Sequence, residues 1–252
     1  MAIIAVSGKI SSGKDEVGNI IHYFRSIHTD SEYNTFFDYS LVKNGWDNQK
    51  FAGKLKDMVC MLLGCTREQL EDREFKEKEL GEEWWYYLRS KNRTSTMYLY
   101  VNGKPAFDVV LIKLTPRSLL QILGTDCGRD IIHPNIWVNS LMSGYKPSTS
   151  YQMGILDTSV PSYELIGEKM HEGYPNWIIT DCRFPNEAKA ILDKKGVIIR
   201  VNRGDGNTGD HPSETALDDY DMFNHVINNN GTIADLVEEV KKVLIIEELY
   251  EV

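Results

Sequence analysis

A glycine-rich stretch near the start of the chain carries residue types that bind phosphate. It runs from Gly8 to Lys14, with four residues between Gly8 and Gly13 and a lysine directly after the second glycine. Glycines let the backbone curl so that successive N–H groups point inward at phosphate oxygens, and the lysine brings a point charge to the outer phosphates. This spacing is typical of a P-loop. The residues that we expect to bind the nucleotide are Gly8, Lys9, Ser11, Ser12, Gly13, Lys14 and Asp15.

Asp15 stands where the usual P-loop has a serine or threonine, whose hydroxyl binds magnesium. A carboxylate at this place can hold Mg²⁺ directly or through a water molecule, and we interpret Asp15 as a metal ligand. An alternative stays open, because the N-terminus of a helix favours an anion even without a metal.

Strand and helix patterns surround this stretch as a P-loop requires. The apolar run of residues 2–6 predicts a buried strand before it. After it, Val17, Ile20, Ile21 and Phe24 recur at helical spacing, which predicts a helix from residue 13 to about residue 25.

A second polar pair, Asp181 and Arg183, follows the apolar strand predicted for residues 177–181. An aspartate there can hold Mg²⁺ through water, so Asp181 is the second predicted metal residue, and the arginine can clamp a phosphate. The alternative is a salt bridge within the loop.

Strands alternate with helices along the chain, which predicts an α/β fold with a parallel sheet flanked by helices. Further strands are expected at residues 197–201 and 225–227, and ligands of such sheets bind at the carboxyl ends of the strands. The helices that we expect after residue 50 begin at Leu55, Thr66, Thr115, Ile136, Pro185 and Thr232.

Bulk properties exclude several classes of function. The net charge is −9 and lysines and arginines form no dense cluster, so we expect no nucleic-acid polymer as a partner. No apolar run approaches the ~18 residues of a membrane span, and no secretion signal is read at the N-terminus. We therefore expect a cytoplasmic protein with no membrane partner. The four cysteines show no zinc-site spacing and are expected to be reduced.

Four stretches together resemble the phage-type deoxynucleoside monophosphate kinases, a P-loop kinase family that also has aspartate after the P-loop lysine. Two shorter stretches, 51–56 and 227–232, look similar as well, whereas residues 26–50, 66–113 and 143–176 carry no resemblance. The four stretches are Gly8 to Asp15, Gln121 to Arg129 with Ile136-Trp137-Val138 after it, Thr180 to Glu187, and His211 to Glu214.

The resemblance implies a P-loop NTPase of the nucleoside monophosphate kinase type. The residue pattern of the unmatched stretch predicts an inserted helical and β-hairpin region. We expect a single P-loop kinase domain over residues 1–252. Its core is about 1–25, 51–65, 115–142 and 177–252, its insertion is about 66–114 with a hairpin turning at Asn102-Gly103, and its lid or loop candidates are 143–176 and 203–212.

The resemblance also implies ATP as donor, a deoxynucleoside monophosphate as acceptor and Mg²⁺. Phosphoryl transfer needs two anionic substrates held in line with their charge neutralised. Lys14, Arg129 and Arg183 are the predicted catalytic residues. A monomer or homodimer is expected, in the host cytoplasm if the chain is phage-encoded.

Arg129, Asp126, Arg183 and His211 are the predicted substrate-binding residues. Arg129 follows a turn expected at residues 124–126, where its guanidinium could grip the acceptor phosphate, although a salt bridge with a neighbouring aspartate is the alternative. His211 and Glu214 resemble an acid–base pair. The acceptor oxygen is already anionic and needs no base, so we expect a positional role. The alternative is a turn in which Ser213 and Glu214 start a short helix.

Two other functions fit the sequence. The chain could be a kinase of another small phosphorylated acceptor, such as phosphomevalonate, or a module that binds ATP without transferring phosphate.

Overall fold

The computed structural model describes residues 2–26, 46–89, 100–101, 104–105, 109–153, 167–204 and 212–249. The chain divides into two compact units, the first formed by Met1–Phe51 with Val138–Val252 and the second by Ala52–Trp137. The prediction of a single domain over 1–252 remains a prediction.

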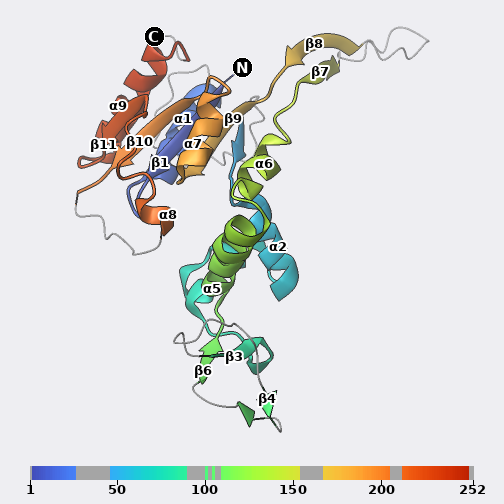
Figure 1. Ribbon diagram of the computed structural model, residues 1–252. Helices are drawn as coiled ribbons and strands as arrows, with labels where there is room; N and C mark the ends of the chain where they lie inside the picture. Colours follow the sequence, from blue (N-terminus) through green and yellow to red (C-terminus); the bar gives the residue numbers. More distant parts are fainter. Residues whose placement is uncertain are drawn as a thin grey trace. The chain divides into compact units, whose positions relative to one another are not determined.

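The first unit is built on a five-stranded sheet in the order β11-β10-β1-β9-β2 (Figure 1). Every neighbouring pair is parallel, as predicted. β2 lies in the region 26–50, where no element was predicted, and its polar sequence Trp-Asp-Asn-Gln explains why. The strands are β1 (Ile3–Gly8), β2 (Trp46–Gln49), β9 (Asn176–Cys182), β10 (Val197–Asn202) and β11 (His225–Asn228).

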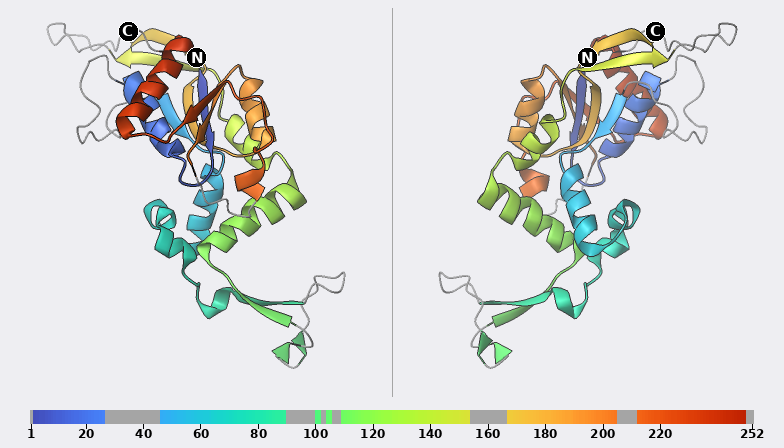
Figure 2. Two further views of the ribbon diagram at one scale, coloured as in Figure 1. Left: turned by 90° about the vertical axis from the view of Figure 1, so that its left-hand side faces the viewer. Right: turned by 90° about the vertical axis from the view of Figure 1, so that its right-hand side faces the viewer.

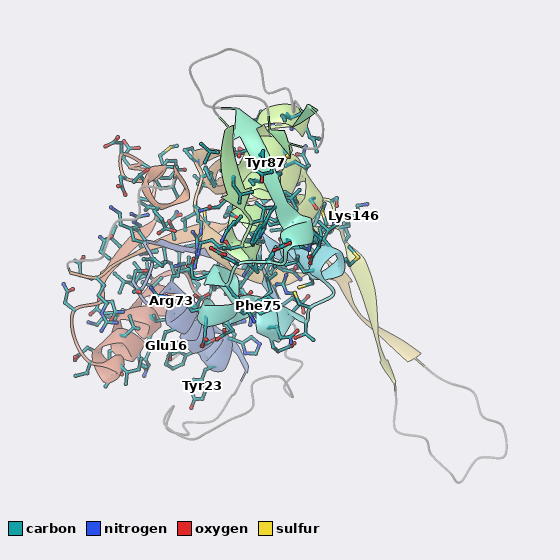
Figure 3. The ribbon with its side chains drawn as sticks, turned by 90° about the horizontal axis from the view of Figure 1, so that it is seen from below. Glu16, Tyr23, Arg73, Phe75, Tyr87 and Lys146 are labelled. Atoms are coloured by element: carbon teal, nitrogen blue, oxygen red, sulfur yellow. The ribbon has the colours of Figure 1, made fainter. Side chains whose placement is uncertain are left out.

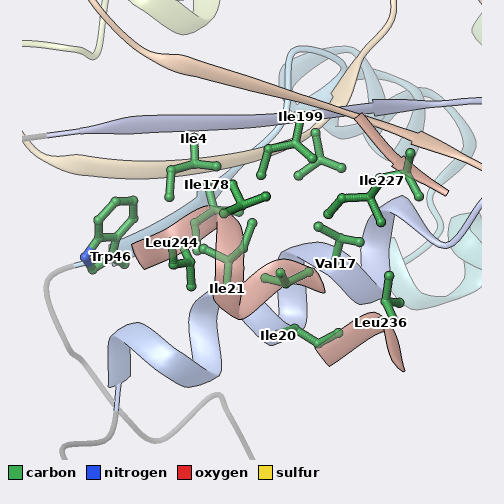
Figure 4. Close-up of a cluster of buried hydrophobic side chains, with 14 residues drawn as sticks. Ile4, Val17, Ile20, Ile21, Trp46, Ile178, Ile199, Ile227, Leu236 and Leu244 are labelled. Atoms are coloured by element: carbon green, nitrogen blue, oxygen red, sulfur yellow. The ribbon is translucent and has the colours of Figure 1, made fainter. Parts of the chain in front are cut away.

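One face of this sheet is covered by α1 (Lys14–Ser26) and α9 (Ile233–Ile246). Side chains alternate along β1, so Ile4 and Val6 point to this face and meet the apolar residues of both helices (Figure 4). α1 matches its predicted range, and Thr232 caps α9 as expected, because its hydroxyl accepts from the Asp235 N–H at 3.3 Å.

The opposite face is covered by α7 (Pro185–Leu192) and by the part of α6 (Ile136–Met142) that belongs to this unit. Ile3 and Ala5 of β1 pack there against Ala188 and Ile191 of α7. In Figure 2, α1 and α9 (blue and red) lie on one side of the sheet and α7 (orange) on the other. The predicted parallel sheet with helices on both faces is confirmed.

The sequence of residues 143–176 predicts a loop with one short element, whereas the structure has two strands there. β7 (Ser148–Met153) and β8 (Gly167–Gly173) pair antiparallel. The backbone N–H and C=O groups of these strands form hydrogen bonds with one another across the pair. A composition rich in serine, glycine and tyrosine does not reveal such pairing.

The second unit has its own apolar cluster of Leu55, Val59, Leu70, Leu119 and Trp137. Phe75, labelled in Figure 3, packs against it. Its elements are α2 (Gly53–Leu63), α3 (Arg67–Glu71), α4 (Arg73–Glu77), η2 (Glu82–Trp84), β3 (Trp85–Arg89), β4 (Tyr100–Val101), β5 (Lys104–Pro105), β6 (Val109–Lys113), α5 (Pro116–Gln121) and η3 (Ile122–Ile132).

Local signals in this unit were read correctly. Thr66 and Thr115 cap α3 and α5 with their hydroxyls, as the sequence predicts. β4 and β5 pair antiparallel on either side of residues 102–103, where the hairpin was placed, and β3 pairs antiparallel with β6.

The turn expected at residues 124–126 was wrong, because the chain continues from α5 into the π-helix η3 through Ile132. The glycines there serve packing. The Gly124 carbonyl accepts from the Trp137 indole N–H at 2.8 Å, and a Cβ on Gly128 would lie 2.6 Å from the Leu123 carbonyl oxygen. π-helical turns occur often at functional sites.

No helix among the residues that the structure describes has the length and apolar character needed to cross a membrane.

Glu71 provides a pH test of the second unit. Lost hydration alone would raise its pKa, but the hydrogen bonds and charges of Lys56 and Lys76 outweigh this and lower the pKa to about 2. Because the folded pKa lies below the unfolded value of 4.5, the stabilisation is present above pH 4.5 and is lost as the pH falls toward about 2.

We expect Glu71→Gln to reduce the free energy of unfolding by about 0.5–1 kcal/mol at neutral pH, a figure discounted for a partly exposed carboxylate. Urea titrations should show this difference shrinking as the pH falls below about 4.5. Glu77→Gln, which removes one exposed ion pair with Arg117, is the matched control. A Glu71→Gln difference that stays constant with pH would contradict this account.

Candidate phosphate-binding site

The loop between β1 and α1 has the backbone conformation that a phosphate cradle needs. Ser11 and Gly13 have φ angles of +62° and +93°, and the Ser12 N–H donates to the Lys9 carbonyl at 3.2 Å, which closes a tight turn. A Cβ on Gly8 would lie 2.3 Å from Ser12 Oγ and 2.9 Å from the Val201 carbonyl oxygen. Only glycine fits at this start of the loop.

Asn229, directly after β11, fixes the far side of the loop. Its side-chain Nδ2 donates to the Ser12 carbonyl at 2.9 Å in a buried position, and its backbone N–H donates to the Asn202 carbonyl at 2.7 Å. A Cβ on Gly13 would lie 2.4 Å from that Nδ2. The sequence marked this residue only through the similarity of residues 227–232, without a role.

Lys14 places its charge inside the loop. The side chain is 8% exposed, and Nζ donates to the Lys9 carbonyl at 3.3 Å. Burial and the nearby Arg183 guanidinium lower the pKa of Lys14, against the opposing charges of Asp15 and Glu214. An anion bound next to this ammonium would relieve the repulsion from Arg183, as a phosphate does in a P-loop.

Asp15, in the first turn of α1, is held by two partners. Its Oδ1 accepts from the Thr180 hydroxyl of β9 at 2.9 Å and lies 3.4 Å from Lys50 Nζ. Lost hydration would raise the pKa of Asp15, but Lys50, Thr180 and Lys14 together outweigh it and hold the pKa below its usual value. Lys50 was missed in the sequence because β2, which it follows, was missed.

Asp181 and Arg183 lie where β9 ends. Asp181 Oδ1 accepts from the Phe51 N–H at 2.9 Å, so this carboxylate ties β9 to the residue that follows Lys50. The Arg183 backbone N–H donates at 2.8 Å to Glu187 of α7, a carboxylate that is 2% exposed. The Arg183 guanidinium forms an ion pair with Glu214.

Lys9 also has an acidic partner. Its Nζ lies 2.9 Å from Asp218 Oδ2, and the other oxygen of Asp218 lies 3.3 Å from Arg200. Arg200 Nη1 in turn donates to the Ser7 hydroxyl at 3.1 Å. Cations and carboxylates therefore alternate around the end of β1.

The structure thus brings together Gly8 to Asp15, Asp181 and Arg183 in the first unit, and adds Lys50, Glu214 and Asn229. Asp126 and Arg129 lie on η3 of the second unit, and their roles remain predictions. His211 lies outside the described residues. In the described part of the chain no group of three or more histidine, cysteine, aspartate or glutamate side chains is placed to hold a metal ion.

The chain matches a family model and known proteins. A family model described as deoxynucleotide monophosphate kinase matches residues 86–240, a range that contains Arg129, Asp181 and Arg183. A putative deoxynucleotide monophosphate kinase of Acanthamoeba polyphaga mimivirus is 28% identical over 134 residues, which are 50% of this chain and 59% of that protein. The deoxynucleoside-5'-monophosphate kinase of Escherichia phage T5 is 22% identical over 271 residues, which are 94% of each chain.

Proposed function

Because the chain belongs to the deoxynucleotide monophosphate kinase family, and is therefore a phosphotransferase acting on nucleotide monophosphates, we propose that it transfers the γ-phosphoryl group of ATP to a deoxynucleoside monophosphate. The products are ADP and the deoxynucleoside diphosphate. Two alternative functions are a non-catalytic ATP-binding module and a kinase of another phosphorylated acceptor. An assay with a panel of acceptors distinguishes both from the proposed function.

The loop around Lys14 is the observation that carries this proposal. Ser11 and Gly13 have left-handed backbone conformations, which suit a loop whose N–H groups bind phosphate oxygens. The buried Lys14 supplies a positive charge suited to the β- and γ-phosphates of ATP. Arg183, fixed at the end of the neighbouring strand β9, adds a guanidinium that can stabilise charge on the transferred group. These residues bind and orient, and the acceptor phosphate oxygen attacks without a protein base.

Mg²⁺ fits the carboxylates that are present. This cation keeps several waters and binds through one or two carboxylates plus substrate phosphates, so a cage of protein ligands is not required. Asp15 offers one carboxylate at the loop, with Oδ1 already anchored by Thr180. We propose that Asp15 binds the Mg²⁺ ion and that Asp181 helps to hold it through water. The bound ion would neutralise phosphate charge.

The acceptor is assigned to the remaining candidate residues. Arg129 carries a guanidinium that can bind a phosphate with two hydrogen bonds, and Asp126, three residues before it, lies on the same π-helix η3. His211 and Arg183 complete the proposed substrate-binding set. Nothing in these residues selects a particular base.

An acceptor panel tests the proposal directly. We expect ADP release from ATP only when dAMP, dCMP, dGMP or dTMP is added. Lys14→Ala should abolish transfer and leave the melting temperature near that of the wild type, because the ammonium faces the loop. Lys189→Ala, which removes an exposed lysine paired with Asp193, is the control and should keep full activity.

Other outcomes would replace the proposal. ADP release that depends only on a different phosphorylated acceptor would indicate another small-molecule kinase. Tight ATP binding without any acceptor-dependent turnover would indicate a binding module, and wild-type turnover in Lys14→Ala would remove the loop from the reaction.

Arg129 should affect the binding of the acceptor monophosphate. We expect Arg129→Ala to raise the KM for the monophosphate about 10- to 100-fold, because a hydrogen bond to a charged group contributes about 1.5–3 kcal/mol. The KM for ATP should change little. Arg117→Ala, on α5 of the same unit, removes an ion pair with Glu77 and is the matched control. An unchanged acceptor KM in Arg129→Ala would refute this role.

Asp15 should set the magnesium requirement. Asp15→Asn keeps an oxygen for Thr180 but loses the charge, so we expect the Mg²⁺ concentration for half-maximal rate to rise and excess Mg²⁺ to restore part of the rate. If Asp15 is only a helix-end anion, the variant should lose roughly 0.3–1 kcal/mol of stability. Its magnesium curve would then superimpose on that of the wild type, which decides against the metal role.

A further inference from the structure

One carboxylate joins two parts of the site that come from distant places in the chain. Glu214 of α8 (Pro212–Thr215) accepts from the Ile10 N–H of the loop at 2.9 Å through Oε2. Its other oxygen, Oε1, forms the ion pair with Nη1 of Arg183. The Glu214 side chain is 10% exposed. Both oxygens therefore engage groups that the transfer reaction uses.

Arg183 needs such a partner because its side chain is long and 33% exposed. An arginine has many rotamers, and an exposed guanidinium would sample most of them. Glu187 holds the backbone N–H of Arg183, and Glu214 holds the guanidinium. Two carboxylates from different elements thus fix the two ends of this residue.

The segment that carries Glu214 is itself anchored. Leu217 is 3% exposed within the apolar cluster that α7 forms with the sheet. Asp218 pairs with Lys9 of the loop and with Arg200 of β10, and its backbone N–H donates to the Thr215 carbonyl at 3.0 Å. The segment that carries Glu214 is therefore held in place by buried and charged contacts.

We propose that Glu214 is a positioning residue of the phosphoryl-transfer site, which holds the Arg183 guanidinium against the loop so that Arg183 and Lys14 face the same phosphoryl group. The inference rests on the proposed function. It assigns Glu214 no proton transfer, because the acceptor phosphate is already anionic. A positioned guanidinium lowers the barrier because it need not reorganise during the reaction.

A double-mutant cycle tests this inference with wild type, Glu214→Gln, Arg183→Ala and the double variant. Glu214→Gln keeps an oxygen for the Ile10 N–H and loses the ion pair. We expect it to lower kcat about 10- to 100-fold, the size of effect that misplacing a catalytic group produces. In the Arg183→Ala background the same change should alter kcat by no more than about twofold, because the residue through which Glu214 acts is gone.

Glu239→Gln is the matched control, because it removes an exposed glutamate–lysine pair on α9 and should leave kcat unchanged. Melting curves check that each variant is folded. If Glu214→Gln melts below the assay temperature, Glu214→Asp, which keeps the charge and shortens the side chain, takes its place in the cycle.

Two results would overturn the inference. Equal losses in both backgrounds would show that Glu214 supports the fold without acting through Arg183. Tighter ATP binding with an undiminished kcat would show that the carboxylate competes with phosphate for the loop.

Failure of the proposed function itself looks different, because wild type would then release no ADP with any monophosphate. The cycle is in that case read on the Kd for ATP by calorimetry. If Glu214→Gln changes this Kd in the wild-type background but not in the Arg183→Ala background, the positioning role is supported. Equal changes in both backgrounds, or no ATP binding at all, would refute it.

Discussion

The site depends on holding like charges together at the end of β1. Lys14, Arg183 and Lys50 are cations that meet around one short loop, and Arg183 and Lys50 each act to lower the pKa of Lys14. Asp15 pairs with Lys50 and Glu214 pairs with Arg183, while Asp218 pairs with Lys9 of the same loop. Such an arrangement is stable without ligand and still offers strong attraction to a polyanion, which is what a phosphoryl-transfer site requires.

The sheet supplies the rigidity for this arrangement. β1 lies between β9 and β10 and is buried along its whole length, so the loop leaves a fixed strand end. The residues that contact or surround the loop come from the carboxyl ends of other strands of the sheet, with Lys50 after β2, Arg183 after β9 and Asn229 after β11. Parallel strands bring these distant residues to one edge, where ligands of α/β sheets bind.

The features that could be predicted from the sequence are those that residues close together in the chain determine. Gly8 and Gly13 with Lys14 identified the loop, and Thr66, Thr115 and Thr232 identified helix starts through hydroxyl caps. Long-range contacts were not predictable. The Glu214 pair with Arg183 spans 31 residues, and the Asn229 bond to Ser12 spans 217, so no spacing rule reveals them. The π-helix η3 was missed because its glycines, which favour turns in isolation, serve close packing here.

The central claim is that the residues around Lys14 transfer a phosphoryl group between two nucleotides. Its most direct measurement uses ATP radiolabelled in the γ-phosphate, incubated with each deoxynucleoside monophosphate and separated by chromatography. The account predicts that the label moves into a deoxynucleoside diphosphate with at least one acceptor, and that it does not with Lys14→Ala. Label that appears only as inorganic phosphate, or that remains in ATP with every acceptor, would contradict it.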